Sequence, residues 1–274
     1  MAKRPPRQSN SEAKPSHNPH HDLGKSHQSP TVKKRLDVLI FERGLAESRQ
    51  KAQAMLLAGS VRVNGQAAGK AGTATATDAA IEIVGDGLKY VGRGGLKLEG
   101  ALEDFGVSPA GKVCLDAGSS TGGFTDCLLQ NGAKRVFAVD VNMQQLDWKL
   151  QRNERVVRVE KNARYLLPED VAERAELIVA DVSFISVAKI LPALIGVAEE
   201  GAIFLILVKP QFELERGEIG KGGIVRDPQL HQKAIERVRE AAITAGLKVL
   251  GVRASRVAGA EGNQEFFLHA RLGA

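Results

Sequence analysis

The stretch LDAGSSTGGFTD, residues 115–126, decides the fold of this 274-residue chain. It continues an apolar run typical of a buried strand, and the glycines at positions 118, 122 and 123 allow the backbone to turn tightly and approach a ligand before a helix starts. A dinucleotide site would favour the spacing G-x-G-x-x-G, whereas here an acidic residue, Asp116, directly precedes the turn. The pattern indicates a nucleotide-like cofactor with a cationic methionine moiety.

A second acidic residue ends the next strand-like run. Asp140 follows Asp116 by 24 residues and is suitably placed to accept hydrogen bonds from a ribose diol. The alternative is that each aspartate only caps a helix or a turn. We expect S-adenosylmethionine as the cofactor. The residues expected to bind it are Asp116, Gly118, Ser119, Ser120, Thr121, Gly122, Gly123, Phe124, Asp140, Val141, Asn162 and Asp181.

After Tyr90, apolar runs alternate with helix-like segments. The runs KVCLDAG, RVFAVDV, VVRVE, LIVADVS and AIFLILV are predicted to be parallel strands buried on both faces. Helices are expected over residues 122–131, 187–197 and 229–245. Only a short loop separates LKVLGVRASRV from NQEFFLHARL, so these last strands should pair antiparallel. The sequence predicts an α/β fold of the Rossmann-like methyltransferase type, with a mostly parallel sheet and a terminal antiparallel hairpin.

Two further charged residues end strand-like runs. Asp181 follows the fourth run in ADVSF, and Lys209 follows the fifth in LVKPQFE. Ligands of open α/β sheets bind outside the carboxyl ends of the strands, so both side chains should lie beside the cofactor. Lys209 could instead be a surface residue whose stem covers apolar groups, but Pro210, which ends the strand, indicates a fixed location for Lys209.

The motifs of two other methyltransferase classes are absent from the sequence, which limits the possible methyl acceptors. Methyltransferases that act on exocyclic amines often carry Asn/Asp-Pro-Pro-aromatic after the fourth strand, and ADVSF differs from that pattern. A cytosine-C5 enzyme needs a cysteine nucleophile in a loop, whereas Cys114 and Cys127 occupy core-like positions and are expected to be reduced. A hydroxyl group is the leading methyl acceptor, and we expect no metal site.

The first 32 residues form a polar tail. Residues 1–34 hold seven Lys/Arg and two Asp/Glu, so most of the net charge of +6 lies there. The segment has no apolar periodicity, and we expect it to be disordered. Its four histidines could bind a metal, but a solvated basic arm is the favoured interpretation.

Residues 33–90 are predicted to form a small α+β module with its linker, followed by the large domain over residues 91–274. RLDVLIFERG and SRQKAQAMLLAG are expected helices, the second capped by Ser48, and SVRVNGQ is an expected strand that ends in an Asn64-Gly65 turn. The module has few aromatic residues for stacking on bases, so we expect it to recognise folded RNA by shape and backbone. The expected phosphate contacts are Arg35, Arg49, Lys51 and Arg62.

Several motifs carry a resemblance to a known family. SRQKAQAMLLAGSVRVNG is similar to the small RNA-binding fold called the alpha-L motif, and VGRGGLKLEGAL, LDAGSSTGGFTD, ADVSFIS, LVKPQFE and GNQEFF resemble the TlyA family of ribosomal RNA methyltransferases. The resemblance covers about residues 33–272, with the motifs in the family's order. It implies an S-adenosylmethionine-dependent enzyme of the FtsJ-like ribose 2′-O-methyltransferases, preceded by an RNA-binding domain.

The family's catalytic Lys-Asp-Lys-Glu tetrad corresponds to Lys97, Asp181, Lys209 and Glu265. Lys209 would then act as the base that polarises a ribose hydroxyl. Without the resemblance, Lys97 would be taken for a solvated lysine on a helix. The resemblance suggests a cytidine as the target. The absence of a C-terminal helical extension favours the large ribosomal subunit, with the small subunit as a further substrate.

Two rival functions remain open from the sequence. Some members of the family have been labelled hemolysins, but the apolar runs are too short for a membrane helix and are explained by a sheet. The other rival is a non-catalytic RNA-binding protein with the same fold. The glycine-rich segment RGEIGKGGIVRDP, residues 216–228, is either a lid or RNA-contacting flap, or a mobile connection. We expect a cytoplasmic monomer that acts on ribosomal RNA within ribosomal subunits, away from membranes.

Overall fold

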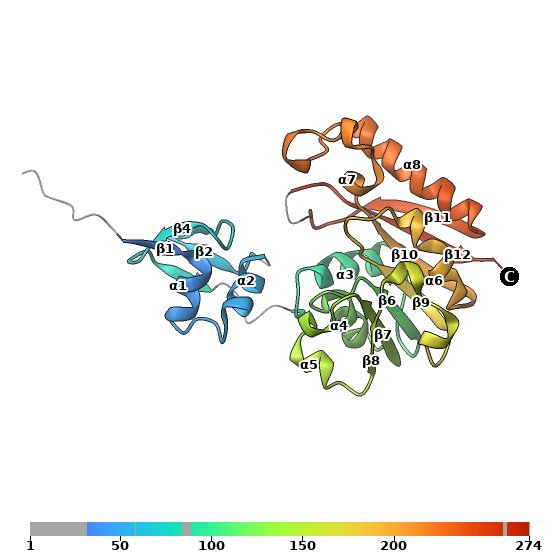
Figure 1. Ribbon diagram of the computed structural model, residues 1–274, viewed down its shortest axis with the longest axis horizontal. Helices are drawn as coiled ribbons and strands as arrows, with labels where there is room; N and C mark the ends of the chain where they lie inside the picture. The colour runs from blue at the N-terminus through green and yellow to red at the C-terminus, as the bar shows by residue number, and fades with distance from the viewer. Residues whose placement is uncertain (1–31, 58, 84–88, 260–261, 274) are drawn as a thin grey trace, which may run out of the picture.

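A computed structural model describes residues 32–57, 59–83, 89–259 and 262–273 (Figure 1). The tail expected to be disordered lies outside these ranges up to residue 31. Lys33 and Lys34, whose composition resembles that of the tail, belong to strand β1 (Lys33–Arg35), which pairs antiparallel with β4 (Ala74–Ala76). The sequence did not indicate this strand, because its partner β4 lies about forty residues further along the chain.

The N-terminal module consists of two helices and two small sheets. Helices α1 (Leu36–Glu42) and α2 (Arg49–Leu57) pack on a core formed by Leu36, Ile40, Ala52, Leu56 and Val61. The predicted cap of α2 is confirmed, since the Ser48 hydroxyl accepts a hydrogen bond from Lys51 N at 3.1 Å. A three-stranded sheet has the order β3 (Gln66–Ala67), β2 (Val61–Val63), β5 (Ile81–Ile83).

The predicted turn at Asn64-Gly65 is also confirmed. Strands β2 and β3 pair antiparallel through the two-residue turn Asn64-Gly65. Both turn residues have positive φ, 50° and 76°, which is the conformation that a tight two-residue hairpin requires and that asparagine and glycine adopt most readily.

The large domain contains a seven-stranded sheet. In sheet order its strands are β11 (Leu247–Ala254), β12 (Phe266–Leu272), β10 (Ala198–Val208), β9 (Ala175–Ala180), β6 (Val113–Ala117), β7 (Arg135–Asp140) and β8 (Val156–Glu160). Strands β8, β7, β6, β9 and β10 run parallel, whereas β12 is antiparallel to both of its neighbours. The predicted fold class, including the antiparallel hairpin, is confirmed.

Helices cover both faces of this sheet (Figure 1). Helices α3 (Gly94–Phe105) and α4 (Gly123–Gln130) pack on one face through Leu98 and Leu128, in the same cluster as Cys114 of β6. Helices α6 (Leu191–Gly196) and α8 (Pro228–Thr244) pack on the other face, where Leu115 of β6 is buried. Adjacent β6 residues thus enter opposite cores, which explains the uninterrupted apolar strand sequences.

The helix expected over residues 187–197 is interrupted. A short 3-10 helix, η4 (Val187–Lys189), precedes α6, and Pro192 lies in the first turn of α6. Proline lacks an N–H group and disfavours helical geometry in the residue before it, so one continuous helix cannot form there. The remaining short helices are η1 (Met143–Gln145), α5 (Trp148–Gln151), η2 (Ala163–Tyr165), η3 (Pro168–Asp170), α7 (Pro210–Glu213), η5 (Arg216–Glu218) and η6 (Lys221–Gly223).

Candidate functional site

The glycine-rich loop connects β6 to α4 at the point where the sheet order reverses, between β6 and β9. Gly118 and Gly122 have positive φ, at 86° and 96°, and Ser120 lies between them with φ of 49°. A Cβ atom on Gly118 would lie 2.6 Å from the backbone oxygen of Asp181, so only glycine fits this crossing of the two strand ends. The loop therefore lies where open α/β sheets bind ligands.

The same loop also fixes the start of α3. A Cβ on Gly123 would lie 2.9 Å from Gly95 N and 3.1 Å from Gly92 O, so the segment 92–95 can approach only because residue 123 lacks a side chain. Lys97 lies on the first turns of α3 and is brought to the sheet edge by this contact. The glycines of VGRGG indicated a close backbone approach, but the sequence did not show that Gly123 is the residue approached.

A cavity of about 700 Å³ lies outside the carboxyl ends of β6, β7 and β8, a size suited to a nucleoside-containing ligand. Of the residues expected to bind the cofactor, six line it: Gly118, Ser120, Asp140, Val141, Asn162 and Asp181. Sequence reasoning missed several others that line it, among them Gln145, Lys161, Arg164 and Ile185. These follow the strand ends within loops of no recognisable motif.

A second, smaller cavity of about 190 Å³ adjoins the first and shares Gly118, Ser120, Asp181 and Ser183 with it. Its wall adds Ser119, Thr121, Gly123 and Phe124 from the glycine-rich loop, and Lys209 from the end of β10. Gly122 lines neither cavity: a Cβ there would lie 2.2 Å from Leu150 Cδ1, so this glycine is required for packing against α5.

Asp116 is fully buried beneath the loop and lines neither cavity. Burial raises the pKa of its carboxyl to about 7; the hydrogen bond from the Thr125 hydroxyl, at 2.6 Å, opposes this shift, and the neighbouring charges of Asp181 and Asp140 add to it. Its Oδ1 atom accepts no hydrogen bond from the described residues. Thr125, which sequence reasoning missed, is thus the direct partner of this carboxyl.

The raised pKa predicts a stability that depends on pH. Between pH 3.8 and about 7 the folded protein keeps a proton on Asp116 that the unfolded chain releases, so this contribution is present below pH 4 and is lost as the pH rises through 7. The difference corresponds to roughly 4 kcal/mol at most. We expect the free energy of unfolding of Asp116→Asn to fall less between pH 4 and pH 8 than that of the wild type, as measured by urea unfolding of the ligand-free protein. An unchanged pH profile would show that Asp116 is ionised in the folded state.

Asp140 is engaged by its own loop. Its carboxylate accepts hydrogen bonds from Ser120 N at 2.9 Å, Asn142 N at 3.2 Å and Gln145 Nε2 at 3.0 Å. These contacts hold the loops after β6 and β7 together around the larger cavity. Asn162 is similar, since its side-chain oxygen accepts a hydrogen bond from Arg164 N and caps η2. Asp140 and Asn162 therefore cap their own loops and also line the larger cavity, so the two roles are compatible.

The residues around the two cavities fit S-adenosylmethionine. Two carboxylates that line the larger cavity, Asp140 and Asp181, lie at the ends of the strands on either side of β6, which favours a cationic ligand and disfavours a pyrophosphate. The buried Ser119 hydroxyl in the smaller cavity accepts or donates no hydrogen bond within the described chain, so it is available to a ligand. Among the described residues, no cluster of side chains suited to a metal ion was found.

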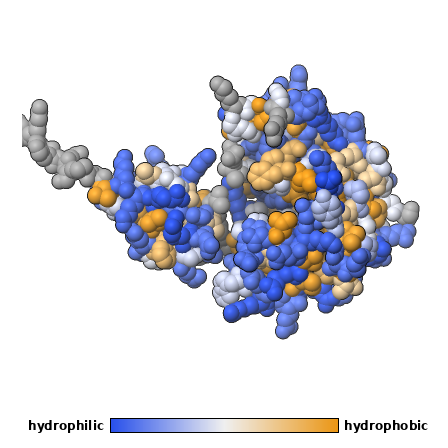
Figure 2. Space-filling view, in the orientation of Figure 1, coloured by the Kyte–Doolittle hydropathy of each residue, from blue (hydrophilic) through white to orange (hydrophobic). Residues whose placement is uncertain are grey.

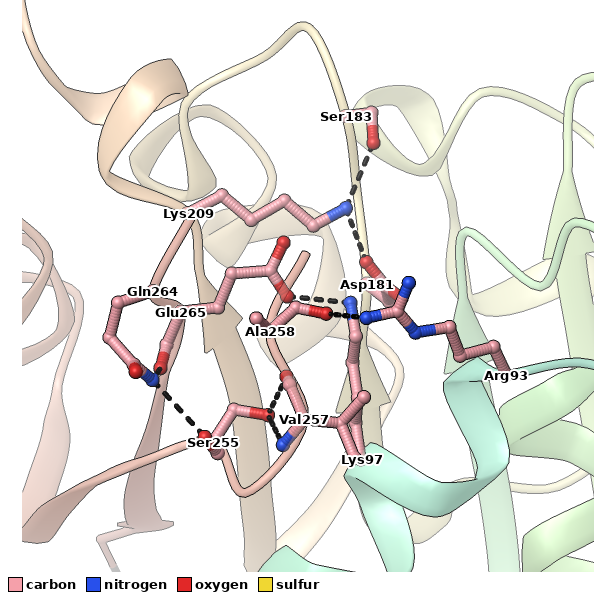
Figure 3. A network of polar contacts seen from close by, with 10 residues as sticks. All are labelled: Arg93, Lys97, Asp181, Ser183, Lys209, Ser255, Val257, Ala258, Gln264 and Glu265. Carbon is pink, nitrogen blue, oxygen red and sulfur yellow. Dashed lines mark hydrogen bonds and ion pairs between the residues drawn. The ribbon is translucent and has the colours of Figure 1, made fainter. Parts of the chain in front are cut away.

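The four predicted catalytic residues form two ion pairs at this edge of the sheet (Figure 3). Lys97 Nζ lies 2.6 Å from Glu265 Oε2, and both side chains are almost completely buried. Lys209 Nζ lies 2.5 Å from Asp181 Oδ1 and donates a hydrogen bond to Ser183 Oγ at 2.9 Å. Lys209 is 9% exposed and Lys97 is 8% exposed, so the interpretation of either as a surface lysine is wrong.

Figure 3 shows the charged ends of these four side chains pointing toward one another. Arg93, just before α3, joins the group and donates to the backbone oxygen of Ala258 at 2.5 Å. Sequence reasoning missed Arg93 and Ser183, although both lie within motifs that it quoted. It also missed Phe184, which follows Ser183 at the cavity wall with 92% of its surface exposed.

The expected RNA-contacting residues fall into two groups. Arg35 and Arg49 both contact the fully buried carboxylate of Asp37, Arg35 through two hydrogen bonds of 3.0 Å. The bond from Arg35 holds the pKa of Asp37 well below its usual range. Lys51 and Arg62 make no side-chain hydrogen bond or ion pair with the part of the chain that the structure describes. Arg35 and Arg49 are therefore partly structural, whereas Lys51 and Arg62 are available to a partner.

Two further findings concern the cysteines and the helices of the described residues. Cys114 and Cys127 are unpaired and buried, as predicted, and burial raises the pKa of each thiol to about 12. No helix in the described ranges is long and apolar enough to cross a membrane.

Comparison with known proteins gives a consistent result. Residues 90–272 match the FtsJ-like methyltransferase family, and residues 34–74 match the S4 domain. The chain is 48% identical to the 16S/23S rRNA (cytidine-2′-O)-methyltransferase TlyA of Mycobacterium tuberculosis, over 86% of this chain and 89% of that protein. It is 45% identical to the protein named Hemolysin A of Brachyspira hyodysenteriae, over 86% of this chain and 98% of that protein.

A solved structure agrees with both matches. A protein from Streptococcus thermophilus, described as a candidate hemolysin, has a TM-score of 0.71 and 42% identity over 89% of this chain and 90% of its own. With the sheet order, the glycine-rich loop and the four charged residues in place, the chain belongs to the TlyA branch of the FtsJ-like methyltransferases and carries an S4 domain at its N-terminus.

Proposed function

We propose that this protein methylates the ribose 2′-hydroxyl of a cytidine in ribosomal RNA, with S-adenosylmethionine as the cofactor. The observation that carries the proposal is the convergence of Lys97, Asp181, Lys209 and Glu265 beside the glycine-rich loop. The names of the TlyA relatives from Mycobacterium tuberculosis and Campylobacter jejuni support the choice of a cytidine ribose in ribosomal RNA.

In this proposal the cofactor is held by the residues around both cavities and supplies an electrophilic methyl group. The binding residues are Gly118, Ser119, Ser120, Thr121, Gly123, Phe124, Asp140, Val141, Asn162 and Asp181, with Asp116 and Gly122 shaping the loop from behind. Asp140 is the residue proposed to face a ribose diol.

The catalytic roles follow from the contacts of each side chain. Lys209 takes the proton from the 2′-hydroxyl onto its Nζ atom, and Asp181 attracts the ammonium group that results. Glu265 fixes the position of Lys97, whose ammonium group stabilises the charge that develops on the ribose oxygen. The reaction thus needs a buried lysine that is free to exchange one proton with the substrate.

The two domains divide the work. We propose residues 33–90 as the RNA-binding domain and its linker, and residues 91–274 as the methyltransferase domain. The S4 match supports an RNA partner, and the exposed Arg62 and the partly buried Lys51 are proposed to contact phosphates. Because ribosomal RNA is the proposed substrate, we place the enzyme in the cytoplasm, with the large subunit as the first substrate and the small subunit as a second.

The proposal is tested with ribosomal subunits from cells that lack the gene. Purified full-length protein and S-adenosylmethionine are incubated separately with large subunits, small subunits and naked rRNA, and the nucleosides are analysed by mass spectrometry. We expect 2′-O-methylcytidine, with the highest yield on large subunits. Methylation of a base, or no methylation of any of the three substrates, would overturn the proposal.

The names of some relatives favour a second candidate, a cytolysin. It predicts dye leakage from liposomes at protein concentrations that also produce methylation. Leakage that persists when methyl transfer has been abolished would support a separate lytic activity.

Charge reversal on β2 tests the RNA-binding role. Arg62 is exposed and lacks a side-chain partner among the described residues, so Arg62→Glu should weaken binding to ribosomal subunits and reduce the slope of log affinity against log salt by about 1. The control is Lys248→Glu on the outer strand β11, a similar charge reversal outside the S4 domain. Equal losses of affinity in both variants would mean that net charge, and not this surface, determines binding.

A further inference from the structure

The hydrogen bond between Lys209 and Ser183 has no assigned role in the proposed reaction. Lys209 Nζ has two polar neighbours among the described residues: Asp181 Oδ1 at 2.5 Å and Ser183 Oγ at 2.9 Å. Ser183 is also shared by the walls of both cavities, so it lies between the cofactor region and the base. Figure 3 shows the Lys209 ammonium group between these two side chains.

The two neighbours act on the amine in different ways. The contact to Asp181 Oδ1 is an ion pair, and this oxygen receives no hydrogen bond of acceptable angle from the described residues. Its attraction depends on distance and hardly on direction. The bond to Ser183 has the distance and angle of a hydrogen bond, and hydrogen bonds weaken steeply when they are bent. Ser183 therefore determines the orientation of the amine.

Orientation matters because a base must present its lone pair to the proton that it removes. A neutral amine has two N–H bonds and one lone pair in a tetrahedral arrangement. One N–H bond points to Ser183 and the other toward Asp181. The lone pair must then take the one tetrahedral position that is left, and we infer that it faces the cavity that Lys209, Asp181 and Ser183 line together. Loss of Ser183 would leave the amine near Asp181 but free to rotate.

Ser183 is itself held firmly relative to Lys209. The next residue, Phe184, has a positive φ of 65°, which is strained for an aromatic residue, and its ring lies 5.2 Å from the ring of Phe212. The buried carboxylate of Glu213 accepts hydrogen bonds from the Ser186 hydroxyl at 2.6 Å and from Val187 N at 2.8 Å. Phe212 and Glu213 belong to α7, which begins directly after Lys209. The loop that carries Ser183 is therefore held against α7, which directly follows Lys209.

We propose that Ser183 is a positioning residue that aims the lone pair of Lys209 at the ribose hydroxyl. This inference rests on the proposed function, because it assumes that Lys209 removes a proton from a ribose. In this proposal Asp181 attracts the amine of Lys209 electrostatically, and Ser183 fixes the direction of its lone pair. This role explains why a hydroxyl lies at the wall shared by the two cavities. The clamp by α7 keeps this alignment while substrates bind and leave.

The test compares Ser183→Ala with Ser183→Thr. Alanine removes the acceptor, and a misaligned base should lower kcat by about 10- to 100-fold with KM for the ribosomal subunit within about threefold of the wild type. Threonine retains an Oγ atom and should restore kcat to within about fivefold of the wild type. Ser108→Ala, at the opposite edge of the sheet, is the matched control and should behave as the wild type.

A second readout does not depend on the RNA substrate. In protein labelled with ¹⁵N-lysine, a hydrogen-bonded and buried ammonium group exchanges its protons slowly and gives a resolved signal. We expect the Lys209 signal, assigned by its loss in Lys209→Met, to broaden through fast exchange in Ser183→Ala and to persist in Ser183→Thr and Ser108→Ala.

The outcomes separate this inference from the proposed function. If the wild type methylates no ribosomal RNA, the proposed function is wrong, whereas the lysine signal still decides whether Ser183 holds the amine. If the wild type is active and Ser183→Ala keeps its kcat, or if alanine and threonine lower kcat equally, Ser183 does not aim the base. A rise in KM alone would also overturn the inference, because it would mean that Ser183 contacts the substrate and acts on binding.

Discussion

Replacing Lys209 by methionine is expected to lower kcat by about 10²- to 10⁴-fold, the usual contribution of a general base, while the affinity for S-adenosylmethionine changes little. Methionine keeps most of the length and the apolar stem of the side chain but removes the amine that contacts Asp181 and Ser183. The glycine-rich loop and the larger cavity, which Lys209 does not line, should remain intact. The loss should therefore appear in turnover and not in cofactor binding.

The measurements are single-turnover methyl transfer to ribosomal subunits and calorimetric titration with S-adenosylmethionine. A matched control is Lys248→Met, which removes an exposed amine on the outer strand β11 that lines neither cavity and leaves the group around Lys209 intact. Retention of more than a tenth of the wild-type rate in Lys209→Met would exclude this lysine as the base. Loss of cofactor binding would instead indicate that Lys209 supports the fold of the loop.

Removing Lys97 is expected to have the largest effect on stability. Its ammonium group is the ion-pair partner of Glu265, and the two side chains are only 9% and 3% exposed. Breaking such a pair from one side leaves a buried carboxylate without its counter-charge, which costs about 3–5 kcal/mol. Lys97→Met should therefore lower the free energy of unfolding of the large domain by this amount, whereas exposed ion pairs such as Lys34–Glu42 contribute less than about 1 kcal/mol.

The double variant Lys97→Met with Glu265→Gln provides the control. It removes both charges, so it should regain at least half of the stability lost in Lys97→Met. Urea unfolding can be followed by circular dichroism and by the fluorescence of Trp148, the single tryptophan of the chain, which lies on α5 in the large domain. A double variant as unstable as Lys97→Met would mean that packing of the lysine stem, and not its charge, stabilises this region.

Most of the large domain could be predicted from local sequence. The strand runs are apolar throughout because both faces of the sheet are covered, and the two buried faces of β6 show this directly in Leu115 and Cys114. The antiparallel hairpin followed from the short connection between the last two strands. Strand β1 was missed because a three-residue strand depends on its distant partner β4. The break before α6 was missed although Pro192 marks it in the local sequence.

The candidate site could be predicted only in part. The aspartates and Lys209 end predicted strands, so their place at one edge of the sheet followed from topology. The buried position of Lys97 could not be inferred in this way, because it requires Gly123 to admit the backbone of Gly92 and Gly95. The sequence likewise did not distinguish Arg62, which is available to a partner, from Arg35, which contacts Asp37.

The sequence by itself determined the fold class and the position of the glycine-rich loop, because these depend on periodicity and on glycine positions, and its resemblance to the TlyA family predicted the four charged residues. Only the tertiary structure decided how the charges are paired. Lys97 and Glu265 lie 168 residues apart and become buried together, and Lys209 reaches Asp181 and Ser183 from a strand that pairs with theirs. Pairing of buried charges is set by the distance between side chains in the folded core, and no local pattern along the chain encodes that distance.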